Sequence, residues 1–126
     1  MLTLRSLILA PVLLLASSGY AAEAPSSVVT ITLEGLNKVT GRTSHLTAPV
    51  GTVMRFGSLE IVARRCWKSE PEDRPENAAL LEIFELRPSE EPQKIFLGWM
   101  FSSSPGLSGL EHPVYDVTVL SCAGKA

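Results

Sequence analysis

From about residue 28 onward, the chain consists of short segments rich in apolar and β-branched residues, each followed by residues typical of turns. Side chains alternate between two faces along a β-strand, so alternation over roughly four to eight residues indicates a strand with one buried face. Such a succession predicts an all-β, single-domain fold, either an antiparallel sandwich or a partly open barrel. The expected strands are 28–33, 38–46, 52–56, 59–66, 79–86, 94–101 and 114–120.

The clearest local feature is a hairpin. Segments 52–56 and 59–66 are separated only by Gly57-Ser58. Glycine at the first position of a two-residue connection favours a type II′ turn, because glycine tolerates a positive φ there. The second arm has two expected faces, Leu59-Ile61-Ala63 on one side and Glu60-Val62-Arg64 on the other.

Three further segments carry specific expectations. Residues 79–86 have helix-forming side chains, but the segment is short and lies between two breaker loops, so a strand is expected and a helix is the alternative. Residues 94–101 are the most apolar, and we expect them at the centre of the core with Trp99 and Phe101 buried. Exposed aromatic anchors of a binding interface are the alternative for these two residues. Ser104 before Pro105 is typical of a helix start, which predicts one short helical turn near 104–110.

The loop 69–77 (SEPEDRPEN) is charged and rich in proline, and it has no apolar periodicity. It is expected to be a solvated spacer between strands. A loop that docks to a partner is the alternative.

The first 21 residues have the three-part layout of a secretory signal peptide. Arg5 precedes an apolar run of about 10 residues, 7–16, and small residues follow to Ala21. A membrane-spanning helix needs roughly 20 apolar residues. We therefore expect a signal peptide over 1–21, a periplasmic location and no membrane span in the mature form. The remaining expected regions are 22–35 (mobile mature N-terminus and first strand), 36–122 (β domain) and 123–126 (C-terminal tail).

Charge and size limit the classes of partner. The 126 residues include 11 basic and 13 acidic side chains, for a net charge of −2. The two signs are interspersed and form no basic block, so we expect no nucleic-acid partner. One domain of this size is expected, acting as a monomer without a cofactor.

The chain has two cysteines, Cys66 and Cys122. In an oxidising compartment an even number of cysteines favours a disulfide. Both residues end apolar alternating segments, which allows strand ends to meet. Two free thiols and a metal-binding pair are the alternatives, although two cysteines alone do not make a zinc site.

Long motifs in the chain closely resemble the DUF2155 family. They are 55–61 (RFGSLEI), 75–79 (PENAA), 98–101 (GWMF) and 111–117 (EHPVYDV). The resemblance covers about 36–122 and implies a small exported protein of a mainly alphaproteobacterial family of unknown function. Cys66 and Cys122 stand where the family pattern has cysteines, which supports the disulfide. The family has no assigned catalytic residues.

One polar cluster suggests chemistry. Glu111, His112 and Asp116 are close in sequence, and nitrogen and oxygen ligands of this kind bind zinc. However, the chain has no HExxH spacing, and Ser-Ser-Ser-Pro at 102–105 is not a GxSxG elbow. We expect no metal and no catalytic residue, and His112 as a turn residue before Pro113. A small hydrolase or metal-dependent enzyme using this cluster is the alternative function.

Binding is the favoured function. Trp67 follows Cys66 beside the charged loop, and Arg64, Arg65 and Lys68 flank it. Large aromatic and arginine side chains are enriched at the centres of binding interfaces. These four residues predict a cationic and aromatic surface for an acidic partner or glycan, and a solvated strand face is the alternative. We expect an uncharacterised periplasmic protein that binds or helps to assemble a cell-envelope partner without catalysis.

Overall fold

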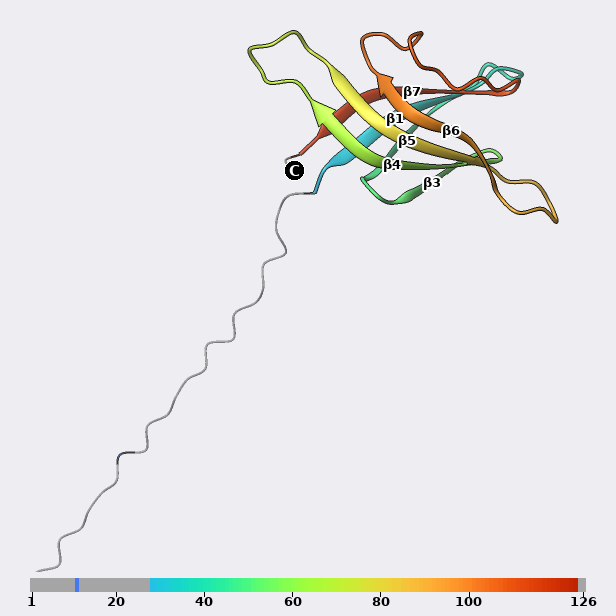
Figure 1. The fold of residues 1–126 in the computed structure, drawn as a ribbon, viewed down its shortest axis with the longest axis horizontal. Coiled ribbons are helices and arrows are strands. Elements are labelled where there is room, and N and C mark those ends of the chain that lie inside the picture. The colour runs from blue at the N-terminus through green and yellow to red at the C-terminus, as the bar shows by residue number, and fades with distance from the viewer. Residues whose placement is uncertain (1–10, 12–27, 125–126) are drawn as a thin grey trace, which may run out of the picture.

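The computed structural model describes residue 11 and residues 28–124, which form two packed antiparallel sheets (Figure 1). The expected signal peptide, apart from Pro11, and residues 22–27 lie outside the described residues. The strands are β1 (Thr30–Asn37), β2 (Thr43–Pro49), β3 (Val53–Phe56), β4 (Leu59–Lys68), β5 (Asn77–Glu85), β6 (Gln93–Phe101) and β7 (Tyr115–Ala123). The all-β sandwich is confirmed, with no closed barrel.

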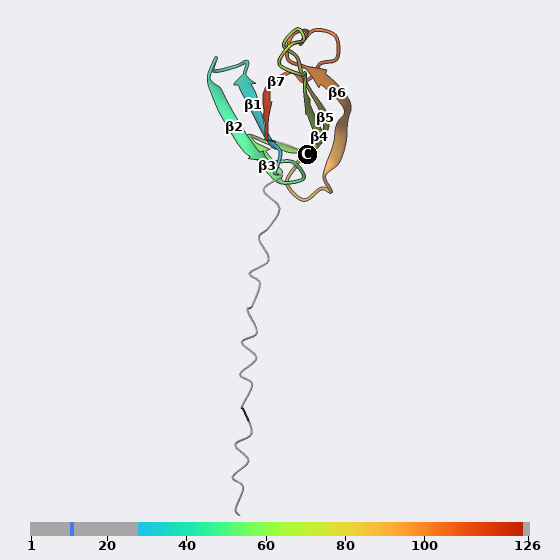
Figure 2. The same cartoon turned by 90° about the vertical axis from the view of Figure 1, so that its left-hand side faces the viewer.

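The two sheets differ in size and lie face to face (Figure 2). One has the order β2-β1-β7, and the other has the order β3-β4-β5-β6. The last strand, β7, returns to pair with β1, so the first and last strands lie side by side. The pairing of β7 with β1 places the end of β7 beneath β4 and β5, where Cys122 contacts Cys66.

The core lies between the inner faces of the two sheets. Leu59, Ile61 and Ala63 of β4 have no exposed surface, as their shared face predicts. Burial of a Val, Leu or Ile side chain contributes about 1.5–3 kcal/mol. Leu110, from the loop between β6 and β7, closes one side of the core. The largest fully buried side chains are Ile31, Leu33, Leu59, Ile61, Leu81, Ile83 and Val119.

The hairpin between β3 and β4 forms as expected. Phe56 pairs with Leu59 across Gly57-Ser58. Gly57 has a φ of 57°, and Ser58 has no positive φ, as a type II′ turn requires. A Cβ atom at Gly57 would also collide with the ring of Tyr115. Glycine is therefore needed here both for the turn and for the close approach of β7.

The expectation that residues 94–101 form the centre of the core is wrong. These residues form β6, the edge strand of the four-stranded sheet. Leu97 is 56% exposed and Trp99 is 39% exposed, because no second layer covers the outer face of this strand. Phe101 is half-buried, and Met100 alone of the strand is fully buried. The segment is apolar on both faces, but only one face packs against the other sheet.

The expected helical turn near 104–110 is also absent, and the described part of the chain contains no helix. Leu107 N–H donates to the carbonyl of Ser104 over 3.1 Å, which makes a single tight turn. Gly106 lies inside this turn and Gly109 follows it, and glycine is unfavourable inside a helix. Within the described residues, accordingly, no helix is long and apolar enough to span a membrane.

Several expected boundaries shift. The first strand continues to Asn37 rather than ending by residue 35, and β2 does not begin until Thr43. Between them, the side-chain oxygen of Asn37 accepts hydrogen bonds from Val39 and Thr40, which stabilises a turn. Ala123, expected in the tail, is the last residue of β7. The segment 79–86, by contrast, forms the strand β5 and not the alternative helix.

Candidate functional site

The outer face of the four-stranded sheet, meaning the face turned away from the other sheet, carries two rows of large side chains. Trp67 on β4 is in register with Ala78 on β5, which is in register with Phe101 on β6. In the next row, Arg65 is in register with Leu80, and Leu80 with Trp99. Side chains on one face of paired strands lie close together, so these rows form one surface. The small side chain of Ala78 leaves a hollow between its two aromatic neighbours.

An irregularity in β4 adds positive charge to this surface. The register between β4 and β5 shifts between Ala63 and Arg65, so one extra residue is accommodated there. As a result, both Arg64 and Arg65 lie on the outer side. Arg64 Nε is 3.2 Å from Glu82 Oε2, and Lys94 Nζ is 3.7 Å from Glu82 Oε1. Within the described chain, Arg65 and Lys68 form no ion pair.

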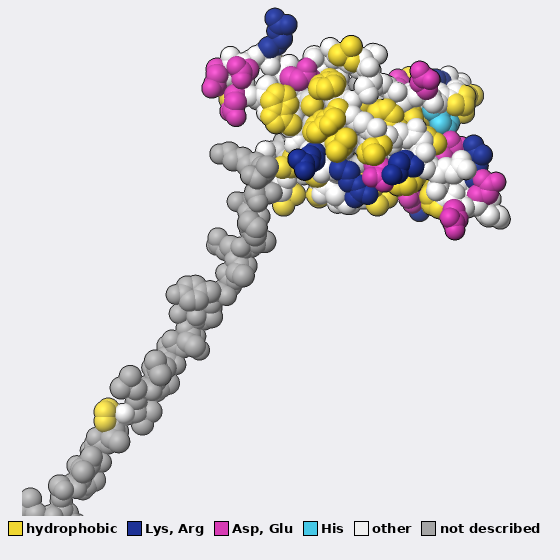
Figure 3. Space-filling view, in the orientation of Figure 1, with side chains coloured by type: hydrophobic (Ala, Val, Ile, Leu, Met, Phe, Trp, Pro, Cys, Tyr) yellow, Lys and Arg dark blue, Asp and Glu magenta, His cyan; other side chains and the backbone are white. Residues whose placement is uncertain are grey.

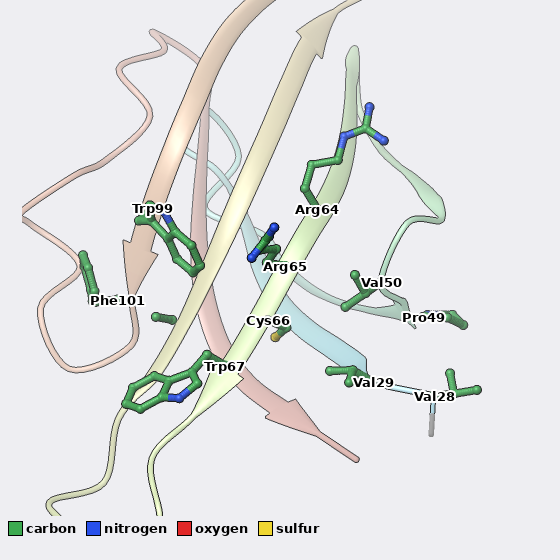
Figure 4. A pocket seen from close by; sticks show the side chains of 11 residues that line it. Val28, Val29, Pro49, Val50, Arg64, Arg65, Cys66, Trp67, Trp99 and Phe101 are labelled. Carbon is green, nitrogen blue, oxygen red and sulfur yellow. The ribbon is translucent and has the colours of Figure 1, made fainter. Parts of the chain in front are cut away.

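A groove of about 1060 Å³ extends from this face over β4 to the turn between β2 and β3. Trp99 and Phe101 lie on one side of β4, whereas Pro49 and Val50 lie on the other (Figure 4). We call this feature the aromatic groove. Its lining residues are Val28, Val29, Pro49, Val50, Arg64, Arg65, Cys66, Trp67, Ala78, Trp99 and Phe101. Concave, mainly apolar sites with a few polar groups are typical of binding sites.

The surface view shows the same distribution of side chains. Hydrophobic side chains gather over the ends of β4, β5 and β6, and basic side chains lie along one side of them (Figure 3). Trp67 is 53% exposed. Exposed apolar patches of this kind are uncommon on monomeric proteins unless they serve an interface. Of the four residues expected to form the binding surface, Arg64, Arg65 and Trp67 line the groove, and Lys68 is exposed next to it.

A disulfide joins Cys66 to Cys122 beneath the groove, with their Cα atoms 5.7 Å apart. It connects β4 in one sheet to β7 in the other. The backbone N–H of Cys122 also donates to Asn77 Oδ1 over 3.0 Å. The expected disulfide is therefore present, and it holds the two sheets together at Cys66, one of the residues that line the groove.

A polar cluster beside the groove was missed at the level of sequence, where residues 69–77 were expected to be a simple solvated spacer. Glu76 Oε1 accepts hydrogen bonds from Asn77 N–H, Ser103 N–H and Ser102 Oγ at 3.0–3.1 Å. Ser103 Oγ donates to the other carboxylate oxygen. These hydrogen bonds hold the pKa of Glu76 below its ordinary value of 4.5. Those from Ser103 have the largest effect, and those from Ser102 and Asn77 have a smaller one. The only signal in the sequence was the motif 75–79, in which Glu76 and Asn77 are adjacent.

The cluster Glu111, His112 and Asp116 does not converge. Glu111 is exposed, and Asp116 Oδ1 accepts from the N–H of Val117. His112 Nε2 lies 3.0 Å from Glu85 Oε2, and His112 Nδ1 accepts from the N–H groups of Val114 and Tyr115 at 3.0 and 3.1 Å. Because Nδ1 accepts two hydrogen bonds, the proton of the neutral ring is on Nε2. His112 thus stabilises the turn into β7.

The chemistry around His112 is accordingly that of a structural hydrogen-bond network. Partial burial raises the pKa of Glu85, but the hydrogen bonds and other electrostatic interactions with His112 and Arg87 together outweigh burial and hold that pKa below 4.5. Nowhere in residues 28–124 do three or more His, Cys, Asp or Glu side chains form a group able to hold a metal ion. His45 Nε2, on β2, lies 3.4 Å from Glu34 Oε2 on β1, whereas the side chain of His112 contacts Glu85 on β5.

The opposite end of the sandwich has a smaller hollow of about 500 Å³. It lies where the turn after β1 meets the start of β7. Its base is formed by Phe56 and Tyr115, whose ring centroids are 5.3 Å apart. Exposed polar residues, including Arg42 and Ser44, form its rim.

These features define a small two-sheet β protein, closed by one disulfide, with an aromatic groove on one face. The chain belongs to the family described as "Uncharacterized protein conserved in bacteria (DUF2155)", whose model matches residues 31–122. It is 34% identical over 87 residues to an uncharacterized protein of Rickettsia prowazekii (strain Madrid E). That alignment covers 69% of this chain and 56% of the relative, so the chain spans little more than half of the length of that relative. No solved structure gives a significant match to the chain.

Proposed function

We propose that this protein is a non-catalytic binding or assembly factor of the bacterial cell envelope, and that it acts as a monomer. The observation that carries the proposal is the aromatic groove. Its two exposed tryptophans, Trp67 and Trp99, lie on a sheet face that no other part of the described chain covers. Tryptophan and arginine are the side chains most often found at the energetic centres of interfaces.

The chemistry of the groove selects an acidic, apolar partner. Arg65 and Lys68 have no ion-pair partner within the described residues, and Glu82, a carboxylate on the same sheet, already lies near two cations. Complementary charge steers a partner toward the groove and fixes its orientation. The apolar surface around Trp99 supplies the area that is removed from water. We therefore take the partner to be an envelope protein that presents an apolar segment with acidic side chains.

Export to the periplasm is part of the proposal. Its support is the signal-peptide pattern of residues 1–21 and the presence of a disulfide, a bond that persists in oxidising compartments. N-terminal sequencing of the protein from a periplasmic fraction tests this part. We expect the mature chain to begin at Ala22. Recovery of the uncleaved chain from the cytoplasm would overturn it.

Site-specific photocrosslinking in cells tests the binding role. A photoreactive aromatic residue replaces Trp99 in one variant and Val39, which is 77% exposed and does not line the groove, in the matched control. We expect one envelope protein to crosslink from position 99 and not from position 39. The purified partner should then bind the oxidised protein, and Arg65→Glu should weaken that binding. The same adducts from both positions, or no binding by the purified partner, would overturn the proposal.

A further inference from the structure

Part of one edge of β4 has no strand beside it. On the side of β3, only Leu59 to Val62 are paired, because β3 begins at Val53 and its first residue pairs with Val62. One more contact follows, where Gly51 N–H donates to the carbonyl of Ala63 over 2.8 Å. From Arg64 to Lys68, β4 is paired on its β5 side only. The four-stranded sheet therefore has a notch at this corner, and the aromatic groove includes it.

The backbone groups facing the notch can be assigned by alternation. Ser69 N–H donates to the carbonyl of Glu76, toward β5. Successive residues of an antiparallel strand direct their backbone groups to opposite sides, so those of Lys68 and Cys66 face away from β5. Within the described chain, no backbone hydrogen bond reaches these two residues from the notch side. They are a short template on which another strand can form.

The opposite side of the notch is apolar. Val29 and Val50 lie across from β4 (Figure 4), and Val50 N–H donates to the carbonyl of Val29 over 2.9 Å, which holds the two residues together. A strand inserted here would direct alternate side chains toward these valines. Its other side chains would point outward, on the side of Arg64 and Arg65.

We propose that an extended segment of the partner, with alternating apolar and acidic residues, adds to β4 at residues 64–68 and continues the line of β3. This proposal rests on the proposed function and specifies how the partner binds. Charge decides between a foreign strand and a second copy of the chain. Antiparallel pairing of two copies through 64–68 would bring Arg65 and Lys68 near like charges, which is unfavourable, whereas an acidic strand is complementary.

The test uses a synthetic peptide of about ten alternating valine and glutamate residues. A valine–lysine peptide and a valine–glutamate peptide with two central prolines are the controls. Binding to the oxidised protein is followed by tryptophan fluorescence, since both tryptophans of the chain line the groove. Amide exchange of Cys66 and Lys68 is measured by NMR, with the amide of Trp67 as the internal reference because it faces β5.

We expect the valine–glutamate peptide alone to bind, and to slow exchange at Cys66 and Lys68 by about tenfold or more. Exchange at Trp67 should not change. Lys68→Pro removes the N–H that faces the notch and should weaken binding by about tenfold, whereas Lys68→Ala, which keeps that N–H, should weaken it less. Both variants must first show the disulfide and cooperative unfolding of the parent protein.

Three results would overturn strand addition. The first is a change in tryptophan fluorescence without protection of the Cys66 and Lys68 amides. In that case the groove is still a binding site, and the proposed function still stands. The second is equal binding by the proline-containing peptide. The third is no binding by any of the peptides at millimolar concentration while the partner still crosslinks from position 99.

Discussion

The side chain of Asn77 and the backbone of Cys122 join the two sheets through a hydrogen bond of 3.0 Å from Cys122 N–H to Asn77 Oδ1. Asn77 begins β5, and Cys122 is near the end of β7, so the bond connects strands from different sheets. It lies beside the disulfide that links the same β7 residue to β4. The end of the sandwich beneath the aromatic groove is therefore held by one covalent and one polar connection.

Removal of the disulfide should lower stability strongly. The two cysteines are 56 positions apart, and a crosslink over a loop of that length contributes roughly 4 kcal/mol on the chain-entropy model. We expect the double variant Cys66→Ser, Cys122→Ser to lose several kcal/mol of unfolding free energy in urea. The parent protein under reducing conditions should match the double variant. An unchanged melting temperature on reduction would contradict this role.

Asn77→Ala should destabilise the protein by about 1–3 kcal/mol, because it leaves the buried N–H of Cys122 without its side-chain partner. The substitution also removes the contact of Asn77 Nδ2 with Ser102 Oγ. Gln93→Ala, at an exposed position of β6, is the matched control and should change little. Urea unfolding at neutral pH measures both. Equal stability of the two variants would show that the bond between β5 and β7 does not matter.

The contribution of Glu76 should depend on pH. Its pKa is lower in the folded protein than its ordinary value of 4.5, so its stabilising contribution is present above that value and is lost as pH falls through the folded pKa. The stability difference between the parent protein and Glu76→Gln should therefore be larger at pH 7 than at about pH 3. Glu90→Gln, at an exposed turn, is the control. A difference that did not vary with pH would contradict the role of the carboxylate.

Gly57→Ala should be more harmful than Gly41→Ala. Both glycines have positive φ values, 57° and 73°, so both variants carry a backbone cost of about 1 kcal/mol. Only at Gly57 does the added Cβ also meet the ring of Tyr115, whereas nothing lies within 4 Å at Gly41. Thermal unfolding of the two variants measures the difference. Similar melting temperatures would show that Tyr115 moves aside without cost.

Trp99→Ala should cost much less stability than Leu81→Ala. Leu81 is fully buried, and truncation of such a residue costs about 2–5 kcal/mol. Trp99 lies on the outer face and is 39% exposed. A small loss for Trp99→Ala, measured by urea unfolding, would show that this residue is available for binding without being needed for folding. A loss equal to that of Leu81→Ala would identify Trp99 as part of the core.

Sequence alone determined the class of this fold, because strand alternation, turn glycines and cysteine number are properties of local segments. The hairpin at Gly57-Ser58 follows from two adjacent strands and a two-residue turn. The pairing of the cysteines follows from their even number and the expected oxidising compartment. The family membership followed from contiguous motifs. None of these predictions requires knowledge of which strands face each other across the sandwich.

The tertiary structure decided which apolar faces are covered. The segment 94–101 is apolar on both faces after Lys94, and only its position at a sheet edge shows that Trp99 faces outward. Glu76 and Ser103 are 27 positions apart and meet only because β5 and β6 pair in this register. The free edge of β4 likewise depends on the short length of β3. Such relationships arise from long-range pairing, and local side-chain patterns carry no information about them.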